Sequence, residues 1–418
     1  HEYFTELRSA GPVHRHPHPE WGHMWSLVRV AEIREVSRHP ATYSSQPNPF
    51  IDVESGDTDG LLISLDPPEH TRMRMLVSKG FTPRRVRELE GRIQHHVNRL
   101  LDDVAADGGC EMVSAMASEL PLQVIAEMVG VPDEDRHQVF HWTEESFGFD
   151  PTVTAEQRRE AATAMFVYAD ELCQERQRHP QDDLMSVLID AEVDGHRLTQ
   201  MQIDLFFLLL QNAGSETTRN LITSGTIALL EHPDQLAWLR EDLTGRLPQA
   251  IEELLRWATP ILQFTRQLTD DAVIGGQEMA AGEHVTLWYP SANRDESVFD
   301  RPFELDLSRD PNDHVAFGSG GPHFCLGANL ARLEGRIIFE TLFTRIRGLR
   351  LDADPSSLPR EHTIIIDGTA ELPLAWVYVE PASNSRTFAR QSAAYDHEFD
   401  ASATGGAVDD TVGCRRPE

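Results

Sequence analysis

The sequence predicts a mainly helical protein with a small β-subdomain. Between His70 and about Arg350, apolar residues recur at three- and four-residue spacing, which is the pattern of helices that bury one face. From Pro260 to Pro290 that rhythm gives way to short segments typical of strands. With 418 residues, the chain is long enough for one large domain or two subdomains.

The predicted elements follow in order along the chain. The first 45 residues indicate a short helix followed by strands, and the Pro, Asn, Asp, Ser and Gly content of residues 44–60 indicates a loop. Pro248 is expected at the first position of its helix, where a missing N–H costs nothing. The helical pattern is clearest in four segments, which are residues 86–105, 156–178, 201–230 and 248–257.

Two further predictions complete the fold. Residues 273–276 and 284–288 are expected to form the small β-element. The polar, aperiodic residues 383–418 are expected to be a disordered tail, with Cys414 inside it. Residues 1–382 are therefore expected to form the folded domain.

Composition argues against several classes of protein. The chain has 37 Lys and Arg against 68 Asp and Glu, a formal net charge of −31. Nucleic acid is not expected as a partner, since phosphate binding needs clustered Lys and Arg. The longest strongly apolar stretch, Leu205 to Leu210, is far below the ~20 residues of a membrane span. The cysteines lack CxxC spacing, and no signal peptide is recognisable, so we expect a cytoplasmic protein without zinc or disulfides, and a monomer.

One cysteine lies in a glycine-rich loop ahead of a predicted helix. Four glycines, at 318, 320, 321 and 327, surround Cys325, and a helical run over residues 328–344 follows. Glycines let a flat ligand approach the backbone, and N–H groups at the start of a helix stabilise a thiolate. A thiolate here is a candidate ligand for haem iron. A lone cysteine in such a turn is, however, more often a small buried hydrophobe.

The long central helix carries an unusual interior. Thr199 and Gln202 have the spacing of a capping box at its start. Residues 213–220 gather small and hydroxyl side chains, which disfavour a helix interior, Gly by about 1 kcal/mol relative to Ala. A kink that opens a groove for oxygen or a ligand would explain them. Glu216 beside Thr217 is a candidate proton relay, although such a pair alone is more often an exposed polar turn.

These two segments carry a family resemblance. Residues 317–332 resemble the haem-binding loop of the cytochrome P450 family, and residues 213–220 resemble its oxygen-binding motif. The resemblance covers residues 5–380 and implies the fold of that family, with haem b between the central helix and the cysteine loop. It implies that Cys325 is the axial ligand to the iron.

The same resemblance assigns roles to neighbouring residues. It implies that Thr217 is the hydroxyl on the oxygen side of the haem and that Glu216 is the acid that feeds protons. It also implies haem contacts for Ala213, Phe317 and Gly327.

The cysteine loop departs from the commonest family pattern at one place. That pattern has Phe seven residues before the cysteine, where this chain has Gly318, and Phe317 stands eight before. The extra glycine resembles actinobacterial members that oxidise steroids and long lipid chains.

A buried ion pair is implied downstream of the central helix. Glu253 and Arg256 lie three apart on one predicted helix and match the structural pair of the family, with Glu252 as the competing partner. The third member of the network is expected at Glu304, where many members carry Arg or His, or at Arg301 as a substitute.

The haem propionates are expected to bind four cationic or donor side chains. His70 and Arg74 share a helical face at i,i+4 spacing, and Arg266 and His323 complete the set. Each of them alone is more often solvent-facing. Their positions match the propionate-binding places of the family.

The activity that the resemblance implies is insertion of one oxygen atom from O₂ into a hydrophobic substrate. Hydroxylation of a steroid, fatty or isoprenoid chain is expected ahead of hydroxylation or epoxidation of a polyketide, terpene or carrier-bound amino acid. Ile261, Leu262, residues 364–366 with Ile365, and residues 44–63 are expected to line the pocket.

Electrons are expected from NAD(P)H through a ferredoxin and its reductase, because the chain shows no flavin or iron–sulfur motif. A basic patch on the cysteine side of the haem is expected to dock the ferredoxin. Two other classes are weighed, a haem protein that binds ligands without catalysis and a peroxide-driven enzyme; the intact acid–alcohol pair argues against both. The candidates for the patch are Arg72, Arg84, Arg85, Arg332 and Arg336.

Overall fold

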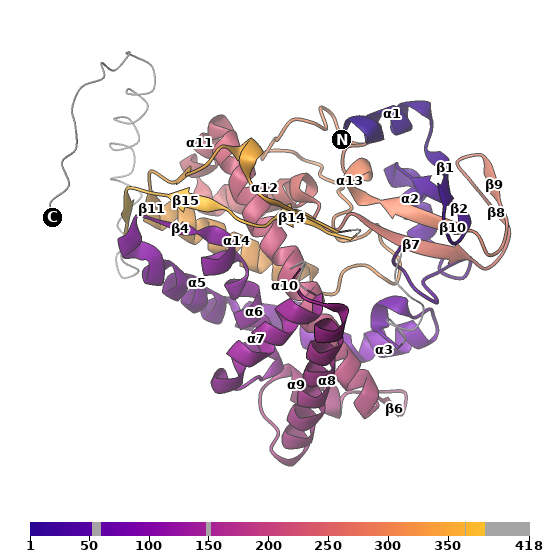
Figure 1. The fold of residues 1–418 in the computed structure, drawn as a ribbon, viewed down its shortest axis with the longest axis horizontal. Helices are drawn as coiled ribbons and strands as arrows, with labels where there is room; N and C mark the ends of the chain where they lie inside the picture. The colour runs from indigo at the N-terminus through magenta and orange to yellow at the C-terminus, as the bar shows by residue number, and fades with distance from the viewer. Residues whose placement is uncertain (52–59, 148–151, 364, 381–418) are drawn as a thin grey trace.

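The computed structural model describes residues 1–51, 60–147, 152–363 and 365–380 (Figure 1). The predicted tail and Cys414 lie outside the described residues. The mainly helical architecture with a small β-subdomain is confirmed. One long helix, labelled α10, crosses the middle of the molecule. The strands near the N-terminus lie together at one end of the molecule (Figure 1).

The helices include those predicted over residues 156–178, 201–230 and 328–344. They are α1 (Glu2–Ala10), α2 (Val30–Arg38), α3 (Glu69–Val77), α4 (Pro83–Glu88), α5 (Glu90–Val104), α6 (Glu119–Val129), α7 (Asp133–Phe147), α8 (Ala155–Arg178), α9 (Leu184–Asp190), α10 (Gln200–Glu231), α11 (Pro233–Glu241), α12 (Leu243–Ala258), α13 (Tyr289–Ala292) and α14 (Ala328–Arg345).

The strands are short. They are β1 (Val13–His18), β2 (Gly22–Leu27), β3 (Tyr43–Ser44), β4 (Gly109–Glu111), β5 (Glu192–Val193), β6 (His196–Arg197), β7 (Gln263–Leu268), β8 (Ala272–Ile274), β9 (Gln277–Met279), β10 (His284–Trp288), β11 (Ile346–Arg347), β12 (Arg350–Leu351), β13 (Arg360–His362), β14 (Asp367–Thr369), β15 (Pro373–Ala375) and β16 (Tyr378–Val379).

The largest sheet joins the two β-regions that the sequence predicts. Its strand order is β1-β2-β10-β7-β3, with β2 and β10 parallel and the other neighbours antiparallel. Val285, Thr286 and Leu287 of β10 are all fully buried, so both faces of this strand are covered. Arg266 pairs with Val285 in this register. The sheet therefore fixes the backbone of a residue expected at the functional site.

The central helix α10 begins as its sequence predicts and stays helical through its middle. The capping box is confirmed, because Gln202 N donates to Thr199 Oγ1 at 3.3 Å and Thr199 N donates to Gln202 Oε1 at 3.0 Å. The helix then continues without a break to Glu231. The small and hydroxyl residues at 213–220 thus do not interrupt it.

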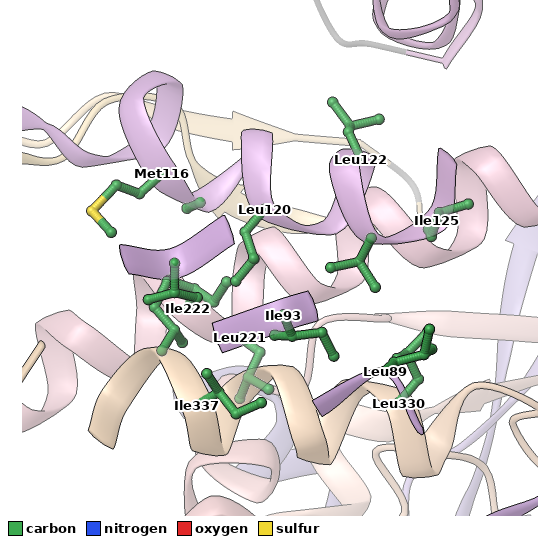
Figure 2. Close-up of a cluster of buried hydrophobic side chains, with 14 of the residues drawn as sticks. Leu89, Ile93, Met116, Leu120, Leu122, Ile125, Leu221, Ile222, Leu330 and Ile337 are labelled. Carbon is green, nitrogen blue, oxygen red and sulfur yellow. The ribbon is translucent and has the colours of Figure 1, made fainter. Parts of the chain in front are cut away.

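The hydrophobic core lies around α10. Helices α6, α8, α12 and α14 pack against it. Figure 2 shows part of this core, where Leu221 and Ile222 of α10 lie among side chains of α5, α6 and α14. Ile93, Leu120 and Ile337 in that cluster are at most 1% exposed. This packing holds α10 and α14 in fixed positions relative to each other.

Two boundaries differ from the prediction. The helical pattern over residues 86–105 is two helices, α4 and α5, separated at Leu89. Pro248 is not at the first position of α12, because Asp242 caps a helix that begins at Leu243 and accepts from Gly245 N at 3.1 Å. The proline therefore lies inside the helix near its start, where it removes one intrahelical hydrogen bond. Among the helices of the described residues, none is long and apolar enough to cross a membrane.

Candidate active site

The cysteine loop ends where α14 begins, as predicted. Cys325 N donates to the Phe317 carbonyl at 2.9 Å, which closes the loop. Gly318 and Gly320 have positive φ, and Gly321 approaches α2 so closely that a β-carbon would lie 1.8 Å from Ser37 O. The glycine-rich sequence is thus needed for this backbone path.

The sulfur of Cys325 is accessible and yet surrounded by protein. Cys325 is exposed, while burial is the largest influence on its thiol and raises the pKa. Backbone N–H groups of Gly327 and Ala328, together with the charge of Arg74, act in the opposite direction and stabilise the thiolate.

Phe317 stacks beneath a fixed arginine. The Arg332 guanidinium lies 4.5 Å from the centre of the Phe317 ring and forms a bidentate pair with Glu252 at 2.6 and 2.8 Å. His314 also contacts Glu252, at 3.1 Å. Although burial alone would raise the pKa of Glu252, these hydrogen bonds hold it at about 2. Glu252 thus anchors the loop and does not compete for Arg256.

The four residues expected at the propionates come together from three parts of the chain. The rings of His70 and His323 lie 4.2 Å apart, and Arg74 donates to the Phe324 carbonyl. Arg266 is 6% exposed and donates to the Thr265 carbonyl. Burial, followed by the charges of Arg74 and Arg266, lowers the pKa of His70 to about 4 against the opposing effect of Asp66.

This cluster has more cationic and donor groups than acceptors. Both ring nitrogens of His70 are buried and lack a hydrogen-bond partner among the described residues. His323 is hydrogen-bonded to Ser45 Oγ at 3.1 Å, and Asp66 is engaged by Ser44 Oγ and Ser45 N. The unpaired N–H of the His70 ring beside two arginines suits an anionic ligand. The donor set, together with an accessible sulfur, therefore fits a haem with its two propionates.

The middle of α10 presents both accessible and polar side chains. Ala213 is exposed although it lies halfway along the central helix. Thr217 Oγ1 donates to the Ala213 carbonyl at 2.8 Å, and Ser215 Oγ donates to the Gln211 carbonyl at 2.5 Å. The hydroxyls are therefore satisfied within the helix, which explains how it stays continuous through this sequence.

Glu216 faces a small polar hollow on the other side of Thr217. It accepts a hydrogen bond from Arg219 Nη2 at 2.8 Å. Burial raises the pKa of Glu216 to about 7; Arg219 opposes this rise, and the charges of Glu361 and Glu144 add to it. The hollow is lined by Ser118, Leu122, Thr143, Glu144, Asn212, Ser215, Glu216 and Arg219.

The predicted ion pair is present, and its third member is different from the one expected. Arg256 donates to both oxygens of Glu253 at 2.7 Å, with both side chains fully buried. Arg309 donates to the same carboxylate at 3.1 Å. The prediction of Glu304 or Arg301 is wrong, because Glu304 offers Arg256 only its main-chain carbonyl at 3.3 Å, and Arg301 pairs with Glu304 at the surface.

The residues expected in the substrate pocket meet at one place. Leu262 N donates to the Ile365 carbonyl at 2.7 Å, and Ile261 forms a bridge with Ile366. Ile261, Leu262 and Ile365 are half-buried. Residues 52–59 and 364 of the expected lining lie outside the described residues.

The predicted basic patch is largely neutralised. Arg84 pairs with Glu88 at 3.0 Å, Arg85 with Asp182 at 3.6 Å, and Arg336 with Glu90 at 2.6 Å. Arg332 pairs with Glu252, as described above. Of the five candidates, Arg72 remains as an exposed arginine without an ion pair in the described part of the chain.

Sequence reasoning missed several partners at the site. Arg309 of the ion-pair network, Ser45 beside His323, and Glu361 beside Arg219 are each far in sequence from the residue they bind. The spacing of residues along the sequence does not predict such contacts. Asp66 is the exception, because it precedes His70 by only four residues and acts on the same cluster.

Comparisons with known proteins agree with this geometry. The cytochrome P450 family model matches residues 110–363. The chain is 40% identical over 389 residues to a methyl-branched lipid omega-hydroxylase of Mycobacterium tuberculosis, covering 89% of this chain and 90% of that protein. It is 37% identical over 372 residues to a steroid C26-monooxygenase of Rhodococcus jostii, covering 86% and 78%.

A solved structure gives the same result. A Mycobacterium marinum cytochrome P450 in complex with pseudoionone superposes with a TM-score of 0.84 at 36% identity, covering 90% of this chain and 94% of that one.

Proposed function

This chain belongs to the cytochrome P450 family and is a haem-dependent monooxygenase of hydrophobic substrates, and on that premise we propose that Cys325 is the iron ligand and that a branched lipid chain is the substrate. The observation that carries the ligand assignment is the exposed Cys325 just before α14, near Arg74, Arg266 and the unpaired ring nitrogens of His70. When bound, haem activates O₂ so that one oxygen atom enters a C–H bond of the substrate and the other leaves as water.

The chain's own residues hold the cofactor from two sides. The N–H groups of Gly327 and Ala328 stabilise the thiolate of Cys325. Arg74 and Arg266 offer charge-assisted hydrogen bonds to the propionates, and His70 and His323 complete the cradle. The Phe317 ring, held under Arg332, limits access of water to the loop.

Protons reach the oxygen side through α10. Glu216 has a pKa of about 7, so it is present in both protonation states near neutral pH. It can give a proton toward Thr217 and recover one from the polar hollow beside it. The Thr217 hydroxyl, which donates to the Ala213 carbonyl, has its oxygen free to receive that proton.

The substrate proposal rests on the two relatives and on the apolar residues near the site. The names of the two relatives specify a methyl-branched lipid oxidised at its omega position and a steroid oxidised at C26. Ile261, Leu262 and Ile365 supply apolar surface suited to such a chain. Tailoring of polyketides is the less favoured reading, although a polyketide-synthase cytochrome P450 of Bacillus subtilis shares the fold at a TM-score of 0.83.

We further propose that a ferredoxin and its reductase deliver electrons from NAD(P)H in the cytoplasm. The ion pairs of the other candidates limit the docking charge, and among the five candidate arginines Arg72 on α3 is the one without an ion pair in the described residues. Replacing Arg72 by Glu is expected to slow reduction of the haem by ferredoxin.

The ligand assignment is tested by the spectrum of the reduced protein under carbon monoxide. Wild type is expected to give the strongly red-shifted Soret band of a thiolate ligand, and C325S to lose it. C110S, which changes a cysteine of β4, is the matched control and is expected to keep the band. A wild-type protein without the band, or a C325S protein with it, contradicts the assignment.

The substrate class is tested by the spectral shift of the ferric haem on binding. An iso-branched saturated fatty acid is expected to produce it at lower concentration than testosterone does. Oxidation of the fatty acid at its terminal carbon would support the proposal. Tighter binding and faster oxidation of testosterone would contradict the proposal and indicate a steroid substrate.

A further inference from the structure

A buried arginine on α10 serves two carboxylates at once. Arg219 lies two residues beyond Thr217, and its Nη2 donates to Glu216 Oε2 at 2.8 Å and also to Glu361 Oε2. The side chains of Arg219, Glu216 and Glu361 are 10%, 16% and 22% exposed, respectively. One nitrogen atom therefore divides its hydrogen bonding between the expected proton donor and a residue of β13.

The hairpin formed by β13 and β14 extends from this arginine to the expected substrate pocket. Gly368 of β14 packs flush on α10, where a β-carbon would lie 2.2 Å from Asn220 Oδ1. Glu361 is paired with Gly368 in the hairpin register. Farther along the hairpin, the Ile365 carbonyl accepts from Leu262 N. A ligand that displaces the Ile365 end of the hairpin therefore acts on the strand that carries Glu361.

We propose that Arg219 is a positioning residue that couples the β13–β14 hairpin to Glu216. A substrate that displaces the hairpin weakens the contact between Arg219 and Glu361, and the guanidinium then turns to Glu216 alone. Glu216 becomes the stronger acid when substrate is present. The inference rests on the proposed function, since it takes Glu216 as the source of protons.

The charges around Glu216 set the direction of this effect. Glu361 and Glu144 both raise its pKa, and Arg219 lowers it. Removing the charge of Glu361 leaves Arg219 to pair with Glu216 alone. It also ends the repulsion between the Glu361 and Glu216 carboxylates. Both changes lower the pKa of Glu216. The titratable groups that face the cluster are Arg219 of α10, Glu361 of β13, and Glu144 of α7 with Glu119, His137 and His141 close to it.

The coupling is tested by the infrared carbonyl band of the protonated Glu216 carboxyl, obtained by subtracting the spectrum of E216Q. In E361Q, which keeps an oxygen for Arg219, the midpoint of this titration is expected to fall by about one pH unit. R219Q is expected to raise it. R360Q is the matched control, because it removes an ion pair of 2.8 Å with Asp367 in the same hairpin, and it is expected to leave the midpoint unchanged.

Three outcomes overturn the proposal. The first is an E361Q midpoint equal to or above that of wild type, and the second is a shift in R360Q as large as in E361Q. The third is an unchanged midpoint when the iso-branched fatty acid has saturated the spectral shift of wild-type holoprotein. A normal thiolate band in that protein would leave the proposed function standing, whereas a missing band would overturn the proposed function itself.

Discussion

Two of the buried clusters of charged residues described above differ in whether their hydrogen-bonding groups find partners within the described residues. In the first, the Glu253 carboxylate is shared by Arg256 and Arg309 and also accepts from Asp306 N at 2.9 Å and Asn312 Nδ2 at 3.1 Å. The remaining donors of Arg256 reach main-chain carbonyls of Asn293 and Pro302. Within the described residues, no buried side-chain nitrogen or oxygen of Glu253, Arg256 or Arg309 lacks a hydrogen-bond partner, although Asn312 Oδ1 does.

The second cluster, around His70 and Arg266, is left incomplete by the chain itself. Arg74, Arg266 and two histidines converge, and Asp66 is occupied by Ser44 and Ser45. A protein that buries cations without anions destabilises its own fold unless something else supplies the charge. The comparison teaches that a closed network stabilises the chain, while an open one marks the place of a ligand.

The largest effect is expected at the closed network. Glu253→Ala leaves Arg256 and Arg309 buried without a counter-charge and is expected to cost about 3–5 kcal/mol of unfolding free energy. Urea unfolding of the apoprotein measures it. E304Q is the matched control, because Glu304 enters the network through its main-chain carbonyl. A loss of unfolding free energy below about 1 kcal/mol in E253A would contradict the view that the Glu253 network stabilises the fold.

The open cluster is expected to respond in the opposite sense. Arg266→Gln removes a buried cation, so the apoprotein should be as stable as wild type or more so. Haem should bind about 10–100-fold more weakly, since a charge-assisted hydrogen bond contributes about 1.5–3 kcal/mol. Haem transfer to apomyoglobin measures the second quantity. R15Q, at an exposed arginine of β1 in the same sheet, should change neither.

Glu334 of α14 sharpens the comparison because it is a buried acid that lacks a cation. It is 1% exposed, its Oε2 has no hydrogen-bond partner within the described ranges, and burial raises its pKa to about 8. A raised carboxyl pKa gives stability that is complete below about 4.5 and is lost as the pH rises through 8. Glu334→Gln is therefore expected to stabilise the protein at pH 8.5 by about 1–3 kcal/mol and to have no effect at pH 4.

Thermal unfolding at the two pH values tests this expectation. E340Q, at a partly exposed glutamate of the same helix, controls for the change in helix charge. A stabilisation by E334Q that is equal at both pH values would contradict the assignment of a neutral, buried acid.

The smallest effect is expected at the surface pair that resembles part of the closed network. Arg301 contacts Glu304 at 2.7 Å, and both side chains are more than half exposed. Arg301→Ala should therefore lower stability by no more than about 1 kcal/mol. A larger loss in urea unfolding would restore Arg301 as a member of the network.

Local patterns predicted the parts of this protein that depend on nearby residues. The capping box at Thr199 and the pairing of Glu253 with Arg256 need only three residues of helix, and both are present. The cysteine loop was recognisable because its glycines and the start of α14 lie within a few positions of Cys325. The N-cap of α12 was missed, since Pro248 gave a stronger signal than Asp242.

The remaining contacts depend on tertiary structure. Arg309 reaches Glu253 only after the intervening sheet and α13 have folded back. Ser45 meets His323, and Glu361 meets Arg219, in the same way. The sequence alone contains the charges but not their distances, so the roles of the candidate site residues stay predictions until they are measured.

The tight approach of Gly321 to Ser37 has a consequence for how this protein is made. The two residues are far apart in the sequence, and a β-carbon at position 321 would meet Ser37 O at 1.8 Å. The bend that precedes Cys325 thus packs tightly against the end of α2. During synthesis, the N-terminal segment must wait for the last third of the polypeptide before this bend can form. The loop proposed to bind the haem is accordingly expected to form late in synthesis.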